Sequence, residues 1–318
     1  MSGERVNPRE ALLIHLHIPK TAGTTLSRLV RLRLLRWPPT HWFDHAIMMG
    51  DYNVPWLDQR YAHLDRLSPR RQRRVRFFGS HHFGWGVHER LPSRRPSAYL
   101  TMLRDPVARV MSTYSFLRRE RRIEPTMSIS SFLDQPKPFR TFHVDECQLR
   151  FLAGERGEVI DVPPGACTQT MCDVAMERLD SMFFVGIMEA FDASMMRLAA
   201  AMQWRSCRYH RAQVTPRPID IDDDIRERIE SANRFDRQLY MHARQIHDAS
   251  LNAMGDDREQ RLEQHQRRVA RYSRTLGRAQ DALPTIRRGL ERMKLMPNGQ
   301  RYAASAESAM TESSDEAV

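Results

Sequence analysis

A mainly apolar run near the N-terminus, which ends abruptly in a polar turn, constrains the fold more than any other stretch. Residues 11–18 are short enough to form one buried strand of a parallel sheet. The turn Pro-Lys-Thr-Ala-Gly-Thr-Thr follows at 19–25, and apolar residues resume at Leu26. This order predicts a strand, a tight loop and then a helix that ends before the prolines at 38–39.

The predicted loop has the donors that a phosphate group needs. The first backbone N–H groups of a helix have no partner within the helix, and the helix dipole favours negative charge there. Lys20 adds a positive charge, and the threonine hydroxyls add further donors. A Walker A loop is excluded, because its lysine follows a glycine whereas Lys20 precedes Gly23.

A second phosphate-binding element is predicted where the apolar strand 98–103 ends in Arg104-Asp105-Pro106. Aspartate is a preferred N-cap residue and proline suits the first helical position, so a helix should begin there. The Arg104 guanidinium offers forked donors to a phosphate monoester. Ser112, in the second helical turn, can reach the same group.

A pair of histidines follows another predicted strand, over 75–79. His81 and His82 stand at its carboxyl end, the edge at which open α/β sheets place their chemistry. This position makes both histidines candidates for a role in the chemistry of the site. A histidine pair that only packs or caps is the alternative.

Together these motifs resemble the sulfotransferases that use 3′-phosphoadenosine 5′-phosphosulfate (PAPS). The Lys-Thr-Ala-Gly-Thr form of the loop is similar to the carbohydrate branch, of the heparan or uronyl 2-O-sulfotransferase type and in a bacterial form. The phenol and steroid enzymes more often have Lys-Ser-Gly-Thr-Thr-Trp. In the family a histidine usually follows the glycine of its strand directly, whereas this chain has Ser80 there.

The resemblance implies a P-loop-like, three-layer α/β fold with a central parallel sheet, and a site that needs no metal. PAPS would be the co-substrate, His81 or His82 the base, and Lys20 would neutralise charge on the leaving phosphate. The donor would be bound at its 5′ end by Lys20, Thr21, Ala22, Gly23, Thr24 and Thr25, and at its 3′-phosphate by Arg104 and Ser112.

Arg150 lies in a segment similar to the family's Gln-x-Arg-x-Leu-x-Gly. The resemblance makes it a candidate to orient the cofactor or the acceptor. An arginine on the exposed face of a helix is the alternative.

The remaining segments are predicted to have structural roles. Residues 40–70 show no regular period and predict a long irregular excursion that borders a cleft. A strand is predicted over 182–189, and a helix over 193–204 with Asp192 as its cap. Apolar residues spaced three or four apart predict one amphipathic helix over 225–246.

Four segments are expected along the chain. They are an N-terminal arm (1–10), a sulfotransferase domain (11–250), a charged helical extension interrupted at Pro284 (251–296) and a disordered tail (297–318).

The formal net charge of +11 at pH 7 indicates attraction to polyanions. An acceptor hydroxyl on a carbohydrate or glycolipid fits this charge, with no specific nucleic acid partner and with peripheral membrane contact left open. Four cysteines without paired spacing argue against a zinc site and indicate free thiols. With no targeting segment or run of about 20 apolar residues visible, a cytoplasmic location is expected.

Two other function classes stay open. A nucleotide kinase-like enzyme would share the sheet and a phosphate loop, but it would bind ATP with Mg²⁺, and the position of the lysine argues against it. A non-catalytic polyanion-binding protein would explain the charge, but not the loop, the histidines or the Arg104–Ser112 spacing. The acceptor and the oligomeric state are left open.

Overall fold

The computed structural model describes the chain in the ranges 7–8, 10–34, 46–49, 69, 75–81, 83–90, 95–137, 139–155, 160–205, 207–209 and 221–292. The chain divides into two compact units, Met1–Val269 and Ala270–Val318. All described strands and the candidate site belong to the first unit.

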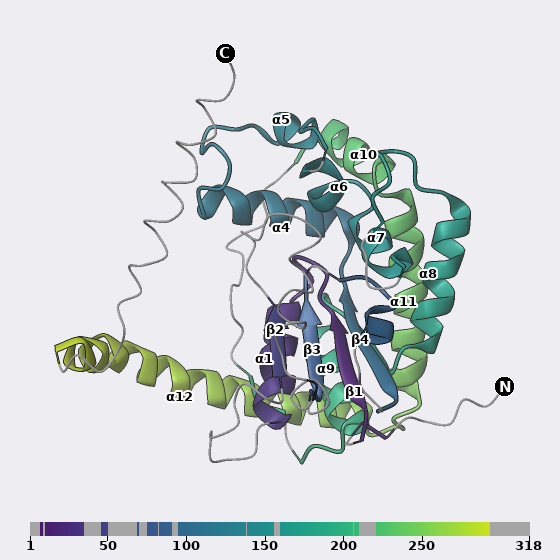
Figure 1. Ribbon diagram of the computed structural model, residues 1–318. Coiled ribbons are helices and arrows are strands. Elements are labelled where there is room, and N and C mark those ends of the chain that lie inside the picture. Colours follow the sequence, from purple (N-terminus) through teal and green to yellow (C-terminus); the bar gives the residue numbers. More distant parts are fainter. Residues whose placement is uncertain are drawn as a thin grey trace. The chain divides into compact units, whose positions relative to one another are not determined.

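Within the described residues, five strands form one sheet (Figure 1). They are β1 (Leu12–Leu16), β2 (Ala46–Met49), β3 (Phe77–Ser80), β4 (Ser97–Leu103) and β5 (Phe184–Ile187). Their order is β2-β3-β1-β4-β5, and each neighbouring pair runs parallel. The predicted α/β class with a central parallel sheet is therefore confirmed. Because β3 and β4 flank β1 on opposite sides, the strand order reverses at β1.

Helices cover both faces of this sheet (Figure 1). The described helices are α1 (Gly23–Leu34), the 3₁₀ helix η1 (Val87–Arg90), α4 (Pro106–Arg119), α5 (Ile129–Leu133), α6 (Phe139–His143), α7 (Cys147–Ala153), α8 (Gln169–Ser181), α9 (Phe191–Ala201), α10 (Asp223–Ser231), α11 (Arg234–Asn252) and α12 (Arg258–Arg292). The last of these begins in the first unit and continues into the second.

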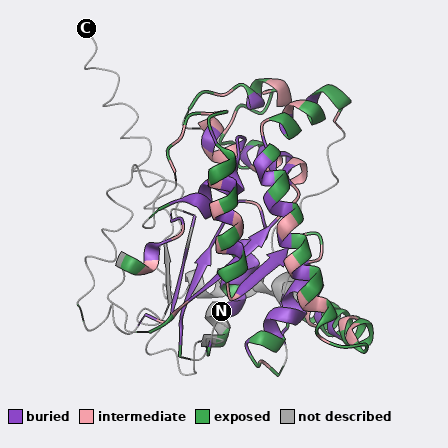
Figure 2. Cartoon of the chain, turned by 90° about the vertical axis from the view of Figure 1, so that its right-hand side faces the viewer, coloured by how far each residue is buried: buried purple, intermediate pink, exposed green. Residues whose placement is uncertain are grey.

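The side chains of β1 alternate between two apolar cores. Leu12, Ile14 and Leu16 pack with residues of α7, α8 and α11 on one face of the sheet. Leu13 packs with residues of α1 and α9 on the other face. Figure 2 shows buried strands between helices that are buried on one side and exposed on the other. Since every residue of β1 is buried, this strand lies in the middle of three layers.

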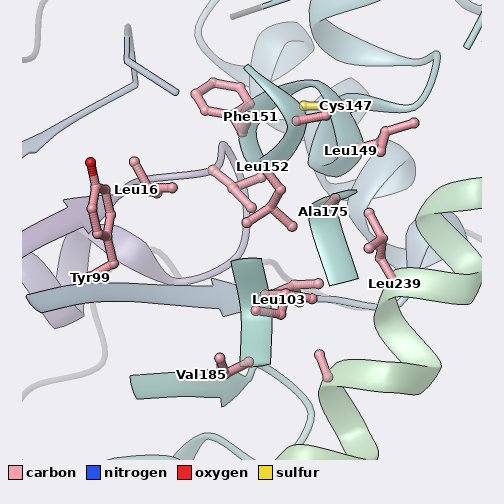
Figure 3. Packing of buried hydrophobic residues seen from close by; sticks show 14 of the residues in the cluster. Leu16, Tyr99, Leu103, Cys147, Leu149, Phe151, Leu152, Ala175, Val185 and Leu239 are labelled. Atoms are coloured by element: carbon pink, nitrogen blue, oxygen red, sulfur yellow. The ribbon is translucent and has the colours of Figure 1, made fainter. Parts of the chain in front are cut away.

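The first of these cores anchors α7 at the carboxyl ends of β1 and β4. Figure 3 shows Leu16 and Leu103, the last residues of those strands, in one cluster with Leu152 of α7 and Leu239 of α11. Burying a leucine side chain contributes about 1.5–3 kcal/mol relative to leaving it exposed. The edge of the sheet from which the site residues emerge is therefore backed by a packed core.

The strand β2 was not predicted. Residues 40–70 were expected to be irregular, and this is wrong at Ala46–Met49, which pairs in parallel with β3. A run of four residues is too short to show a strand period, so the pairing is visible only in three dimensions. The other described residue of this stretch is Pro69, and the expected border of a cleft lies outside the described residues.

The amphipathic segment 225–246 folds as two helices, and the prediction of one helix is wrong. α10 and α11 are separate helices, with Asn233 preceding α11. The carboxylate of Glu146 accepts the N–H groups of Phe235 and Asp236, at 3.0 and 2.7 Å, and so caps α11. The start of α11 is thus fixed by a residue from a distant part of the chain.

Asp192 was predicted to cap α9, and this prediction is wrong. The helix begins at Phe191 with Ala190 in the N-cap position, and Asp192 lies in its first turn. The carboxylate of Asp192 instead accepts the hydroxyl of Tyr209.

The predicted extension over 251–296 contains α12, which continues through Pro284. The expected interruption there is wrong, because the proline removes one helical hydrogen bond without ending the helix. The tail 297–318 and most of the arm 1–10 lie outside the described residues. No helix in the described ranges combines the length and the apolar composition that a bilayer core demands.

Candidate functional site

The connection between β1 and α1 has its carbonyl groups bound one after another by donors from the protein. The pairs are Leu16 O with Ile18 N (3.1 Å) and Thr101 Oγ1 (3.0 Å), His17 O with His81 Nδ1 (2.7 Å), Ile18 O with Thr21 Oγ1 (2.9 Å) and Lys20 O with Arg104 Nη1 (3.1 Å). In a trans peptide the next N–H points away from the carbonyl. Holding the carbonyls therefore also fixes where the N–H groups point.

The backbone of the loop has a conformation that suits anion binding. Among the described residues, none is seen to pair with the backbone N–H groups of residues 20–24. Lys20 and Ala22 adopt left-handed backbone conformations, with φ of 67° and 68°. Left-handed residues in a turn bring successive N–H groups to one side and form a concavity that binds anions. α1 begins at Gly23, so its dipole adds to the positive potential.

The three threonines of the loop differ in their surroundings. Thr21 is fully buried and its hydroxyl is bound to the carbonyl of Ile18, so this side chain shapes the loop rather than reaching outward. Thr25 is buried and Thr24 is exposed in the first turn of α1. Thr24 is therefore the threonine of the loop whose side chain is open to solvent.

Gly23 lets a histidine ring pack against the start of α1. A Cβ atom at this position would lie 2.0 Å from His17 Cδ2 and 2.4 Å from His17 Nε2, and 2.9 Å from His15 Cε1. Contacts this short are not tolerated, so any larger residue would displace the imidazoles or the helix. The glycine of the motif thus has a packing reason as well as a ligand-binding one.

The ammonium group of Lys20 lies over the ring of Phe116 in α4, with Nζ 4.0 Å from the ring centre. Burial, followed by the nearby charges of Arg119 and Arg104, lowers the pKa of Lys20 from 10.5 to about 8, although Glu120 acts in the opposite direction. Lys20 therefore stands among excess positive charge, which a bound anion would offset.

Arg104 joins the second predicted phosphate element to the loop. As predicted, Asp105 caps α4 by accepting the N–H of Ala108 at 3.0 Å, and Pro106 is the first helical residue. The Nη1 atom of Arg104 donates to the carbonyl of Lys20 at 3.1 Å. Two motifs that lie 84 residues apart in the sequence are thus in direct contact.

Two further side chains hold Arg104 in place. Its backbone N–H and carbonyl both bind the carboxamide of Gln148, at 3.0 and 2.9 Å. Its Nε atom lies 4.0 Å from the carboxylate of Glu189, which also accepts the N–H of Asp105 and the hydroxyl of Tyr240, each at 3.1 Å. Burial lowers the pKa of Arg104, and Glu189 partly offsets this.

Ser112 lies in α4 and is 3% exposed. Residues 112 and 116 are one turn apart on the same face of the helix. Ser112 therefore neighbours the Phe116 ring that contacts Lys20, on the helix that begins directly after Arg104.

Three imidazole rings lie next to one another beside the loop, with His15 and His17 stacked and His81 tilted against His17. The ring centre of His17 lies 4.9 Å from that of His15 and 3.7 Å from that of His81. A carbonyl oxygen only accepts, so Nδ1 of His81 carries the hydrogen in its bond to the His17 carbonyl. The neutral ring of His81 then has its lone pair on Nε2. His82, the other predicted base, lies outside the described residues.

The two histidines of the β1 segment are uncharged near neutral pH. Burial and the neighbouring His81 lower the pKa of His15 from 6.5 to about 3. Burial, followed by His81, His15 and Lys20, lowers the pKa of His17 well below 6.5.

Arg150 is buried and bound by the protein itself. Its side chain is 2% exposed, and it forms a 2.5 Å ion pair with the equally buried Asp145. It also donates to the carbonyls of Asp145, Val162 and Pro163. The alternative of an exposed arginine is therefore wrong: Arg150 joins α7 to the 160–165 segment. Its suggested role in orienting the cofactor or the acceptor stays a prediction.

Sequence reasoning missed His15, His17, Phe116 and Gln148. The two histidines alternate along an apolar strand, and this period of two places them on one face, a signal that could have been used. Phe116 and Gln148 act on Lys20 and Arg104 through tertiary contacts, which leave no local signature.

The described residues contain no group of three or more histidine, cysteine, aspartate or glutamate side chains arranged to hold a metal ion. No protein-family model matches this sequence, and a search of curated proteins finds no significant match.

Proposed function

We propose that this protein is a sulfotransferase with a P-loop-like fold, which moves a sulfuryl group from PAPS to a hydroxyl group of a carbohydrate or glycolipid. The observation that carries the proposal is the 3.1 Å hydrogen bond from Arg104 to the carbonyl of Lys20. Through it, the two segments proposed to bind the two phosphate ends of the donor are neighbours. The parallel pairing of β1 with β4 places both segments at one edge of the sheet, and this hydrogen bond joins the side chain of one to the backbone of the other.

The position of these segments in the sheet supports the proposal. In open α/β sheets, ligands bind outside the carboxyl ends of the strands where the strand order reverses. β1 is that strand here, and the N–H groups of residues 20–24 follow it directly. Lys20 and Arg104 supply the positive charge that a nucleotide with two phosphate groups needs.

The proposed reaction is an in-line transfer. The acceptor oxygen forms a bond to sulfur while the bond between sulfur and the 5′-phosphate oxygen breaks, which gives a sulfate ester and adenosine 3′,5′-bisphosphate. The hydroxyl proton passes to a histidine, for which His81 and His82 are the candidates, and Lys20 offsets the charge that develops on the leaving phosphate oxygen. As in phosphoryl transfer, positioning and electrostatic stabilisation supply most of the rate.

The tautomer of His81 suits a proton acceptor. Its Nδ1–H is bound to the His17 carbonyl, so the neutral ring can take a proton only at Nε2. The bond also fixes the orientation of the ring relative to the loop that would hold the donor.

The first test is ligand binding by the purified protein. We expect adenosine 3′,5′-bisphosphate to raise the melting temperature, and ATP with Mg²⁺ or a DNA duplex to do so much less. Stabilisation by ATP with Mg²⁺ alone would favour a kinase-like enzyme, and stabilisation by DNA alone a polyanion-binding protein. Either result would refute the proposal.

Variants make this test specific. Arg104→Ala should weaken binding of the bisphosphate by about 10- to 100-fold, as expected for a lost charge-assisted contact of about 1.5–3 kcal/mol. Lys20→Ala should abolish transfer of ³⁵S-labelled sulfate from PAPS to a panel of sugar and glycolipid acceptors. Arg228→Ala is the matched control, since Arg228 lies in α10 and pairs with Asp134 at 2.7 Å. Normal turnover by the Lys20 variant would contradict the assignment.

A further inference from the structure

The ring of His17 lies between His81, a candidate base of the proposed reaction, and the start of α1, which follows the proposed phosphate loop. One side of its ring faces His81, with 3.7 Å between ring centres. On another side, its Nε2 atom lies 2.4 Å from where a Cβ atom of residue 23 would be, so it touches the first residue of α1.

The ring nitrogens of His17 form no hydrogen bond that is seen within the described residues. The side chain is 96% buried, since 4% of it is exposed. His15 differs, because its Nδ1 lies 2.6 Å from the hydroxyl of Ser27. The Nε2 atom of His15, however, is fully enclosed and has no hydrogen-bond partner within the described residues, whereas the ring nitrogens of His17 are not enclosed in this way. A ligand at the loop would give the N–H of His17 an acceptor.

The chemistry of this ring fits a hydrogen-bond donor to an anion. Burial and the neighbouring His81, His15 and Lys20 disfavour a charge on His17, so the ring stays neutral and keeps one N–H. A neutral imidazole at a helix N-terminus can donate a hydrogen bond to an oxyanion without taking part in proton transfer.

We infer that His17 is a further ligand-binding residue of this site, whose neutral imidazole donates a hydrogen bond from Nε2 to the 5′-phosphate end of the nucleotide. This inference rests on the proposed function. The 5′-phosphate would then be bound by His17 together with Lys20 and the backbone N–H groups of residues 20–24. Gly23 allows this arrangement, because a larger residue there would displace the ring of His17. His17 would thus distinguish ligands that carry a 5′-phosphate from those that do not.

The test compares two nucleotides that differ only in that phosphate. Dissociation constants for adenosine 3′,5′-bisphosphate and adenosine 3′-monophosphate are measured by calorimetry for the wild-type protein and for His17→Phe, which keeps an aromatic ring but has no N–H. We expect the substitution to weaken the bisphosphate at least tenfold and to change the monophosphate less than twofold. His17→Gln, whose amide can reach the place of Nε2, should restore most of the lost affinity.

The possible outcomes separate this inference from the proposed function. If His17→Phe weakens both nucleotides equally, or neither, the inference is overturned and His17 only packs. If the wild-type protein binds neither nucleotide, the proposed function itself fails. If Arg104→Ala weakens both nucleotides while His17→Phe has no effect, the proposed function stands and only the inference is lost.

A second variant covers a failure to fold. Should His17→Phe not yield folded protein by circular dichroism, His17→Asn takes its place, because asparagine is smaller and its amide is too short to reach the phosphate. The same selective loss of affinity for the bisphosphate is expected. If the substitution changes the affinities for the two nucleotides by the same factor, or changes neither, the inference is again overturned.

Discussion

Lys20 combines a left-handed backbone, an ammonium group over an aromatic ring and two neighbouring guanidinium groups. None of these features follows from the order Pro-Lys-Thr-Ala-Gly-Thr-Thr alone. From the sequence, Lys20 was predicted to lie in the loop between a strand and a helix. The contacts with Phe116 and Arg104 come from elements that fold onto the loop from elsewhere.

The lowered pKa of Lys20 gives the site a pH dependence. Because this pKa is about 8 before a ligand binds, the ammonium form declines as the pH rises through 8. Phosphate groups favour the charged form, so binding above that pH requires proton uptake. We expect the affinity for adenosine 3′,5′-bisphosphate to fall by about tenfold in total between pH 7 and pH 9, with most of the loss above pH 8.

Calorimetry at pH 7, 8 and 9 measures this fall. Lys20→Arg provides the comparison, because an arginine stays protonated throughout the range and should give a nearly flat profile. A profile for the wild-type protein as flat as that of the arginine variant would show that the lysine does not titrate in this range.

At the scale of elements, two buried carboxylates cap each other's helices. Glu146, at the N-cap position of α7, accepts two N–H groups at the start of α11, as described above. Asp236, in the first turn of α11, accepts the N–H groups of Gln148 and Leu149 in α7, at 3.0 and 2.7 Å. Since Gln148 also holds the backbone of Arg104, this pair of caps links the helical layer to the candidate site.

We expect Asp236→Ala to lower the free energy of unfolding by about 2–4 kcal/mol, because it leaves two buried N–H groups without acceptors. The matched control is Asp222→Ala. Asp222 caps α10 through one N–H, that of Ile225 at 2.8 Å, and its loss should cost about 1 kcal/mol. Urea denaturation of both variants measures the difference, and equal losses would contradict the importance of the reciprocal caps.

These elements show where prediction from sequence ends. Asp105 and Pro106 act on the residues next to them, so the start of α4 was predictable to the residue. The break before α11 was not, because Glu146 lies 89 residues away from the Phe235 N–H that it accepts. Likewise β2 exists through pairing with β3, and its four residues carry too little local pattern. The strands β1 and β4 were visible because each is apolar along its length and ends in a turn.

At the scale of the whole molecule, the buried histidines tie stability to pH. His15 and His17 are neutral in the folded protein, but each takes up a proton on unfolding below about pH 6.5. Their folded pKa values are lowered, so the stability they contribute is present above 6.5 and is lost as the pH falls below it. For His15 this loss continues to about pH 3. Glu146 acts oppositely: burial and then Asp236 raise its pKa, so its contribution is present at low pH and is lost as the pH rises toward 8.

We expect the free energy of unfolding to fall as the pH is lowered from 6.5. The pKa values of five histidines are lowered in the folded protein, and these outweigh the coupled carboxyl pair Glu146 and Asp236, whose pKa values are raised. The histidines are His15, His17, His143, His247 and His265. Each histidine contributes up to about 1.4 kcal/mol per pH unit. His17→Phe should reduce the slope by about that amount, which urea denaturation at pH 6.5, 5.5 and 4.5 would measure. An unchanged slope in the variant would mean that His17 is not a neutral buried group.

Four of the five backbone carbonyls from Leu16 to Lys20 are bound by side chains. In chain order, these side chains belong to Thr101, His81, Thr21 and Arg104. Each of these bonds requires its carbonyl at one place along the chain. If a single residue were inserted or deleted between His17 and Lys20, the carbonyls of these two residues could not both reach their partners, His81 and Arg104. The length of this short connection is therefore fixed by three separate parts of the protein, and it should tolerate changes of residue type more readily than changes of residue number.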